Sequence, residues 1–190
     1  MIISKDQEIT GKTTSTLRED NTFDFSTNRA LPQSEGAFGY WNLTPVRIEG
    51  DRIYTKAADN LASCAAILAT LDRLQLSGAD ADLWGVFTRA EEVGFMGAGG
   101  IVDAGTVPKR VPIIVLETSL ALPGAEVGKG PVIRVGDRMS VFDPGVEFNI
   151  HSVAQELERT KRGFKFQRQL MSGGSCEATL YVMHKMAVGA

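Results

Sequence analysis

Two adjacent glutamates, Glu91 and Glu92, stand where the sequence changes from a strand-like to a helix-like pattern. The apolar run 83–87 before them predicts a buried strand, and the glycine-containing segment from Gly94 predicts the start of a helix. In open α/β sheets, ligands bind at the carboxyl ends of strands. Neighbouring carboxylates repel each other unless water, a proton or a cation relieves the repulsion. The pair therefore predicts half of a metal-hydrolase active site.

Two further acidic residues follow predicted strands. Asp59 comes after the strand expected over 52–56, and Glu117 comes after the strand expected over 113–116. Carboxylates from separate strand ends could converge at one edge of a sheet. Such a group could hold a pair of divalent ions, with one carboxylate bridging them, and activate a water molecule. A nearby free carboxylate would take the proton from that water.

Each of these acids also has a purely structural interpretation. Asp59 alone could be a helix cap. Glu91 and Glu92 alone could be a solvated helix start favoured by the helix dipole. Glu117 alone could be a structural acid whose hydrogen bonds are satisfied. Their joint occurrence at predicted strand ends favours a site.

From about residue 57 the chain alternates between helix-like and strand-like segments, which predicts a three-layer αβα domain. Asp59 has the residue type of an N-cap, and apolar residues at helical spacing follow it. The continuous apolar run 111–116 predicts a strand buried on both faces. The remaining predicted elements are a strand over 82–87, a helix over 94–103 closed by Gly105, a strand over 131–135, a helix over 146–162, a strand over 164–170 and a helix over 177–186. The last helix would normally lead into another strand.

Residues 1–56 are richer in polar residues and glycine, with short apolar alternations. Gly50-Asp51 separates the alternating segments 46–49 and 52–55 and predicts a hairpin. We therefore expect a small β-rich region that is part of something larger. A disordered leader is the alternative, but the large apolar side chains need burial. These are Phe38, Tyr40, Trp41 and Ile53.

Composition limits the possible functions of the chain. With 43% hydrophobic and 23% charged residues, the 190-residue chain has an ordinary globular composition. Its net charge of -3 gives no indication of nucleic-acid binding. Two cysteines, Cys64 and Cys176, do not make a disulfide framework, and a reduced, cytoplasmic chain is the simpler interpretation. No apolar run suits a signal peptide or a membrane span, so we expect no membrane partner.

Several motifs occur in an order and spacing that resemble the tetrahedral or deblocking (glutamyl) aminopeptidases, which are dinuclear metallopeptidases of the zinc-exopeptidase fold. The resemblance runs from about Tyr40 to the end of the chain. Segment 173–178 also looks like the Gly-Gly-Thr-Asp-Ala segment of that family, with Glu177 in place of the aspartate. The other motifs are Ala58-Asp59-Asn60, residues 87–94 around Glu91-Glu92, residues 114–121 around Glu117, and Gly128-Lys129-Gly130-Pro131.

The resemblance implies a role for each acid. Asp59 would bridge two metal ions, Glu91 would be the general base and acid, and Glu92 and Glu117 would each ligate one metal. Glu117 stands where the family usually has aspartate. The resemblance also implies two divalent ions (zinc or cobalt), a peptide substrate and a homo-oligomer. Residues 1–56 would be part of the inserted β-rich oligomerisation domain, and residues 57–190 part of the αβα catalytic domain.

Two family ligands have no counterpart in these 190 residues. The family uses a histidine of a His-x-Asp motif before the inserted domain and another histidine well after the glycine-rich segment. The two histidines of the chain, His151 and His184, fall in predicted helices, and we interpret both as surface or packing residues. Three carboxylates suit magnesium or calcium better than zinc. We expect either a central part of an aminopeptidase or a diverged, inactive relative.

Two alternatives to an aminopeptidase-like hydrolase stay open. The missing histidines would suit a non-catalytic assembly or regulatory module that keeps the fold. A carboxylate-only glycosidase would need two carboxyl groups about 5 to 10 Å apart around a sugar. Nothing beyond the acids favours the glycosidase, because Trp41 falls in the N-terminal region and Trp84 in a predicted buried strand.

Overall fold

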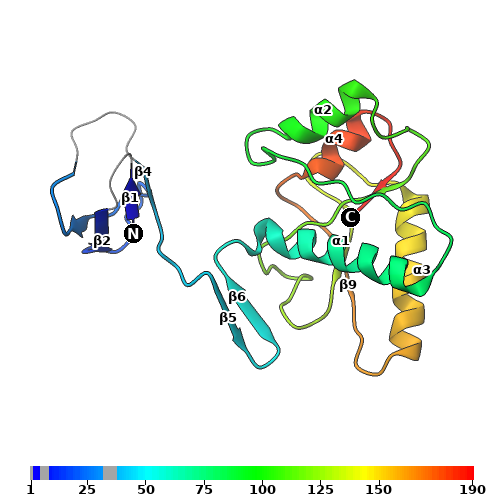
Figure 1. The fold of residues 1–190 in the computed structure, drawn as a ribbon, viewed down its shortest axis with the longest axis horizontal. Helices are drawn as coiled ribbons and strands as arrows, with labels where there is room; N and C mark the ends of the chain where they lie inside the picture. The colour runs from blue at the N-terminus through cyan, green and yellow to red at the C-terminus, as the bar shows by residue number, and fades with distance from the viewer. Residues whose placement is uncertain (1, 5–8, 32–37) are drawn as a thin grey trace. The chain divides into compact units, whose positions relative to one another are not determined.

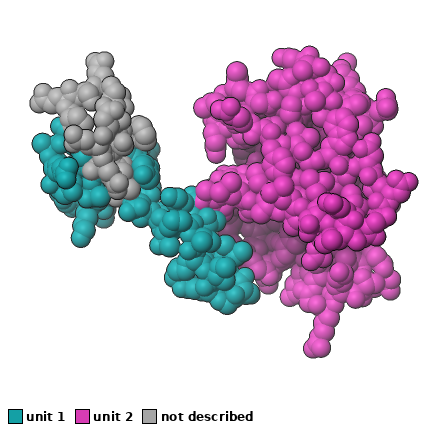
Figure 2. Space-filling model, viewed as in Figure 1, with its two compact units in different colours: residues 1–56 teal, residues 57–190 magenta. Residues whose placement is uncertain are grey.

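The segment around Gly50-Asp51 forms the hairpin that its alternation predicts. In the computed structural model, which describes residues 2–4, 9–31 and 38–190, β5 (Val46–Glu49) pairs antiparallel with β6 (Arg52–Thr55). Gly50 has a positive φ of 60°, which glycine adopts without the steric cost that a side chain brings. The chain divides into two compact units, residues 1–56 and residues 57–190 (Figure 2).

The first unit also contains a four-stranded antiparallel sheet in the order β3-β2-β1-β4 (Figure 1). Its strands are β1 (Ile2–Ser4), β2 (Ile9–Thr13), β3 (Phe25–Thr27) and β4 (Phe38–Tyr40). The expectation of buried aromatic residues here is wrong, since Tyr40 is 45% and Trp41 53% exposed, and Ile53 of the hairpin is 69% exposed. The side chain of Phe38 lies outside the described residues. Trp41 stacks on Phe23, with 5.4 Å between the ring centroids, and still keeps about half of its surface exposed.

The second unit is a mixed α/β fold. Its helices are α1 (Ala58–Ser77), α2 (Met96–Ala104), α3 (Pro144–Thr160) and α4 (Glu177–Met183). Its strands are β7 (Ile113–Ile114), β8 (Val132–Gly136), β9 (Gln167–Leu170) and β10 (Val188–Gly189). Two pairs, β8–β9 and β7–β10, are parallel, and the backbone N–H of Arg134 donates to the carbonyl of Ala190 at 2.7 Å beside β10. The last helix ends earlier than the predicted range 177–186, and the short strand β10 follows it within the chain.

Helix α3 shows how local sequence sets an element. The Asp143 side chain caps the helix by accepting from the backbone N–H groups of Gly145 and Val146, both at 2.9 Å, and Pro144 occupies the first turn. The helix packs on β8 and β10. A Cβ on Gly189 would come within 2.7 Å of the Val146 side chain, so this close approach of helix and strand requires glycine.

The core of the second unit lies around α4. Helices α2 and α4 lie side by side (Figure 1), with Ala98 of α2 in the same buried cluster as Ala178 and Tyr181 of α4. The other buried members of the cluster are Val115, Phe142, Cys176, Met186 and Val188.

Two predicted strands differ from the structure. Residues 82–87 run without strand pairing, and Trp84 is 56% exposed, although Gly85 lies tightly against Leu71 and Ile67 of α1. Among the described residues no segment pairs with 82–87, so an apolar run alone does not form a β-strand. The run 111–116 forms only the two-residue β7, and its Ile114 is 57% exposed, so it is not buried on both faces.

The start of α1 also differs from the prediction. Asp59 is not an N-cap: that position belongs to Ala57, and Asp59 has non-helical φ and ψ of -84° and 108° within the first turn. The peptide bond between Asp59 and Asn60 is cis. The apolar spacing of α1 is not matched by burial either, since Leu61 is 62% and Leu68 58% exposed. No helix in the described ranges combines the length and the apolar character that crossing a membrane requires.

Candidate functional site

The structure brings Asp59 and Glu117 together. Their carboxyl groups lie within hydrogen-bonding reach of each other, and the charge of Glu91 also acts on Glu117. Burial is the main reason that the pKa of Glu117 is raised to about 7, while the backbone N–H of Thr118, which donates to Glu117 Oε1 at 2.7 Å, works in the opposite direction. The negative charges of Asp59 and Glu91 raise the pKa further. A raised pKa of this origin indicates acids that compete for a proton or a cation.

A side-chain hydrogen bond holds Asp59 near Glu117. The Asn60 amide donates from Nδ2 to the carbonyl oxygen of Leu116 at 2.9 Å, which ties the start of α1 to the segment that follows β7. The other amide atom, Asn60 Oδ1, is enclosed and finds no hydrogen-bond partner among the residues that the structure describes. Sequence reasoning assigned no role to Asn60, although it directly follows Asp59.

Glu91 lies in the tight turn that leads into α2. The backbone N–H groups of Gly94 and Phe95 donate to the Glu91 carbonyl at 3.1 and 3.0 Å. A Cβ on Gly97 would come within 2.6 Å of the Arg89 backbone, so this turn requires glycine there. Burial raises the pKa of Glu91, and the charges of Glu92, Glu177 and Asp59 raise it further. Glu91 therefore belongs to the same acidic group, whereas the Glu92 side chain is exposed.

Glu177 is a member of this group that sequence reasoning missed. Its charge acts on Glu91, and its Oε1 atom is enclosed, with no hydrogen-bond partner in the described ranges. The available signal was its place three residues after Gly174, at the start of the predicted helix 177–186, and it is the first residue of α4.

Buried hydrogen bonds fix the turn that carries Glu177. Asp137 Oδ1 accepts from the backbone N–H groups of Met139 and Ser140 at 2.9 and 2.8 Å and from Ser140 Oγ at 3.1 Å. The Thr179 hydroxyl donates to Asp137 Oδ2. The backbone N–H of Cys176 donates to Thr179 Oγ1 at 3.4 Å. These contacts join the end of β8 to the start of α4.

Neither histidine belongs to the site. The His151 ring packs edge-on against Phe166 at 5.4 Å between centroids, and His184 is an exposed residue that ends α4. Both positions agree with the interpretation as packing and surface residues.

The donor set fits a divalent cation only in part. Asp59 and Glu117 offer paired oxygen ligands whose repulsion a hard cation would relieve. Among residues 2–4, 9–31 and 38–190, however, no three His, Cys, Asp or Glu side chains are placed to hold one ion. Glu92 would have to turn toward the Asp59–Glu117 pair to complete three carboxylates.

A mixed α/β unit, with acids gathered from the start of α1, the turn before α2 and the segment after β7, is the architecture of an exopeptidase-like hydrolase domain. The model of the M42 glutamyl aminopeptidase family matches residues 18–189, and the chain belongs to this family. The resemblance inferred from the motifs is thereby confirmed.

Individual relatives agree with this family. An aminopeptidase candidate of Acetivibrio thermocellus is 25% identical over 139 residues, which is 68% of this chain and 38% of the relative. The solved structure of the PhTET1-12s dodecamer has a TM-score of 0.59 at 21% identity, covering 76% of this chain and 43% of its own. The structure of the TET aminopeptidase of a marine sediment archaeon, Thaumarchaeota archaeon SCGC AB-539-E09, also has a TM-score of 0.59, at 23% identity. The match covers 70% of this chain and 39% of that one. The chain thus spans less than half the length of these relatives, and the two structures support the fold.

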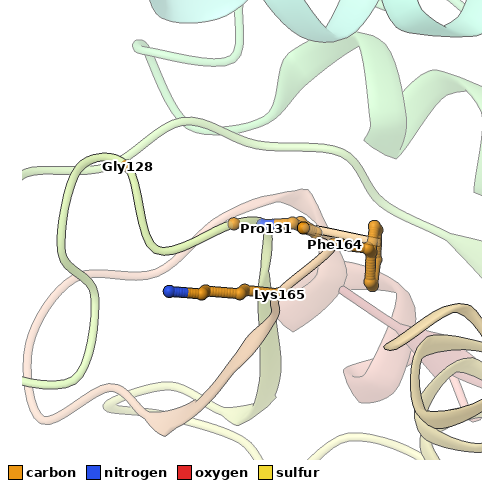
Figure 3. Close-up of a pocket in the computed structure, with 6 residues that line it drawn as sticks. Gly128, Pro131, Phe164 and Lys165 are labelled. Atoms are coloured by element: carbon orange, nitrogen blue, oxygen red, sulfur yellow. The ribbon is translucent and has the colours of Figure 1, made fainter. Parts of the chain in front are cut away.

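The motif Gly128-Lys129-Gly130-Pro131 lies in a different place. Its Gly128, Gly130 and Pro131 line an open pocket just before β8 and β9 begin, together with residues 163–165 (Figure 3). In the close-up, the Lys165 side chain extends below the Gly128–Pro131 loop, and the Phe164 ring points away from it. Glu177, by contrast, follows the end of β9. The pocket is therefore on the strand-starting edge of the β8–β9 pair and not among the carboxylates.

Proposed function

We propose that this chain carries the acidic part of a metal-dependent aminopeptidase site, which removes N-terminal residues from peptides. The observation that supports this best is the grouping of Asp59, Glu91 and Glu117 at the motif positions of an M42 family member. Because the chain spans less than half of its relatives, the activity of a whole protein stays part of the proposal.

In this proposal Asp59 would be shared by two divalent ions, and Glu92 and Glu117 would each help to hold one. A bound divalent cation supplies Lewis-acid polarisation of a carbonyl and lowers the pKa of a water molecule. Binding would also favour the charged form of Glu117, whose pKa is raised without it. Zinc or cobalt follows from the family resemblance, whereas oxygen-only donors favour a harder ion such as magnesium.

Glu91 is the proposed proton carrier. The pKa of Glu91 is raised by burial and by its acidic neighbours, which brings this carboxylate closer to the pKa range of an effective general base. Glu91 would accept the proton of the attacking water and return it to the amine that leaves. Its place in a tight, glycine-dependent turn holds the carboxylate in position for both transfers.

The surrounding assembly is also part of the proposal. The similarity to a dodecameric structure supports a homo-oligomer. Residues 1–56 would be part of the β-rich oligomerisation domain and residues 57–190 part of the catalytic domain. The free cysteines Cys64 and Cys176 suit a reducing cytoplasm.

A second candidate is a non-catalytic module with the same fold. The observation that favours it is that no three potential ligands are grouped in the described part of the chain. This candidate predicts neither metal uptake nor turnover.

Hydrolysis of amino-acid anilides tests the proposal. The 190-residue chain, and the longest natural polypeptide that contains it, should be supplied with cobalt, zinc or magnesium and assayed for release of the free aniline. Metal-dependent hydrolysis that a chelator abolishes is expected. If calorimetry detects no metal uptake and neither polypeptide shows turnover, the non-catalytic candidate stands instead.

A further inference from the structure

Arg134, in the middle of β8, is a buried cation without a counter-charge. The residue is only 6% exposed, yet its guanidinium makes no hydrogen bond and no ion pair with any of the residues 2–4, 9–31 and 38–190. Its backbone N–H is used, since it donates to Ala190. Buried charges in proteins are normally paired, because leaving one unpaired costs several kcal/mol. The structure thus holds five side-chain donors with no acceptor.

The nearest buried acid does not fill this role. Asp137 follows β8 and is 7% exposed, but its two carboxylate oxygens are occupied by Met139, Ser140 and Thr179. Burial has the largest effect on the pKa of the Cys176 thiol and raises it. The positive charge of Arg134 acts on the same thiol and lowers its pKa. Arg134 therefore lies near the start of α4, beside the turn that carries Glu177.

The neighbouring elements leave the end of the side chain reachable. Arg134 is in register with Gln169 of β9, and parallel register partners share a face of the sheet. Gln169 donates from Nε2 to the Pro123 carbonyl at 2.9 Å, so the turn at 122–125 borders this face. Within the described part of the chain, the fully enclosed side-chain atoms without partners are Asn60 Oδ1, His151 Nδ1 and Glu177 Oε1. No Arg134 nitrogen is among these, which means that each retains some accessible surface.

We propose that Arg134 is the binding residue of a site for a single carboxylate group, bordered by the β8–β9 face, the 122–125 turn and the start of α4. The planar guanidinium matches a carboxylate with two parallel hydrogen bonds. One negative charge is favoured over two, because Asp137 and Glu117 also lie close to Cys176 and would repel a dianion. The carboxylate can come from a peptide or from a free amino acid. The assignment does not depend on hydrolase activity, so it is tested on metal-free protein.

The test is a titration of the 190-residue chain with acetate, at constant ionic strength, followed by its thermal unfolding and by the NMR signal of the Arg134 Nε–H group. A ligand that binds the folded state raises the unfolding temperature with a saturable dependence on concentration. We expect acetate to do so and to shift the Arg134 signal, and acetamide, its uncharged isostere, to do neither. Dialanine and free alanine identify the source of the carboxylate: the one that binds more tightly is the preferred ligand, and alaninamide should have no effect.

Two variants make the assignment specific. Arg134→Gln should weaken acetate binding at least tenfold, whereas Arg138→Gln, which removes an exposed positive charge just after β8, should leave it unchanged. If Arg134→Gln does not fold, Arg134→Lys keeps the charge without the planar fork and should still weaken binding. Equal responses of wild type and the Arg134 variants, a response to acetamide, or an Arg134 NMR signal that does not move would overturn the site. Tighter binding of inorganic phosphate than of acetate would overturn the preference for a single charge.

Discussion

Asp59 and Glu117 face each other with their carboxyl groups in hydrogen-bonding reach, although one lies in the first turn of α1 and the other follows β7. The amide of Asn60 fixes this approach through the carbonyl of Leu116. Two carboxylates this close repel each other, and a proton on Glu117 or a bound cation relieves that repulsion. Most of the predictions below follow from that relationship.

The stability of the metal-free chain should fall as pH rises from about 4.5 to 7. Glu117 has its pKa raised from 4.5 to about 7 in the folded chain, so the folded state binds more protons than the unfolded state in that window. The loss should be roughly 1–2 kcal/mol once solvent screening of a half-buried group is allowed for. Urea unfolding at a series of pH values measures it. Glu117→Gln should flatten the profile, and an unchanged profile in that variant would assign the pH dependence to another group.

A divalent cation should bind through Asp59. Titration calorimetry with magnesium, cobalt and zinc is expected to show uptake by the wild-type chain and a loss of at least tenfold in affinity for Asp59→Asn, since the bridging position loses its charge. Asp72→Asn, an exposed change on the same helix, is the matched control and should bind as the wild type does. Equal affinities for all three proteins would place the cation elsewhere.

Thr179→Val should destabilise the second unit by about 1–3 kcal/mol, because it removes a buried hydrogen bond to the Asp137 carboxylate while keeping the side-chain shape. Thr160→Val removes an exposed hydroxyl contact with the Glu156 carbonyl and should cost less than about 0.5 kcal/mol. Chemical unfolding of both variants provides the comparison. Similar losses for the two would mean that the Asp137–Thr179 contact contributes no special stability.

Gly130→Ala should destabilise the fold much more than Gly128→Ala. Both glycines have positive φ, 87° and 83°, so the conformational cost of alanine is shared. Only at Gly130 would the new Cβ meet the Lys165 carbonyl oxygen, at 1.8 Å, whereas the space around Gly128 is open. The difference should be at least about 2 kcal/mol in unfolding free energy. Equal effects would indicate that the β8 and β9 entry loops separate easily.

Local signals in the sequence were sufficient to predict several helices and strands. Apolar spacing alone gave helix 146–162, which the structure has as Pro144–Thr160 because Asp143 caps it and Pro144 begins it. The alternation around Gly50-Asp51 gave the hairpin, and the apolar run at 131–135 gave β8. Gly105 ends α2 as predicted, with a positive φ of 62°. For the helix, the hairpin and the end of α2 the determining contacts are close in sequence, whereas β8 also depends on its distant partner β9.

Predictions that depended on distant partners were less successful. An apolar run such as 82–87 becomes a strand only if another strand pairs with it, and none of the described residues does. The acids at 59, 91 and 117 were named as candidates from their positions after apolar runs, but Asn60 and Glu177 were not. Their involvement depends on enclosed atoms, Asn60 Oδ1 and Glu177 Oε1, that only the fold defines. Arg134 carries no sequence signal either, because its lack of a partner is a property of the packed structure.

The most direct test of the proposed hydrolase is a paired measurement on Glu91→Gln and the wild type, in the longest natural polypeptide that contains this chain. Glu91 is proposed to carry the proton and not to hold the metal. The variant should therefore take up the divalent cation with wild-type affinity in calorimetry while its rate of anilide hydrolysis falls by at least about 100-fold. A variant that binds the metal and retains wild-type turnover would contradict the central role of Glu91.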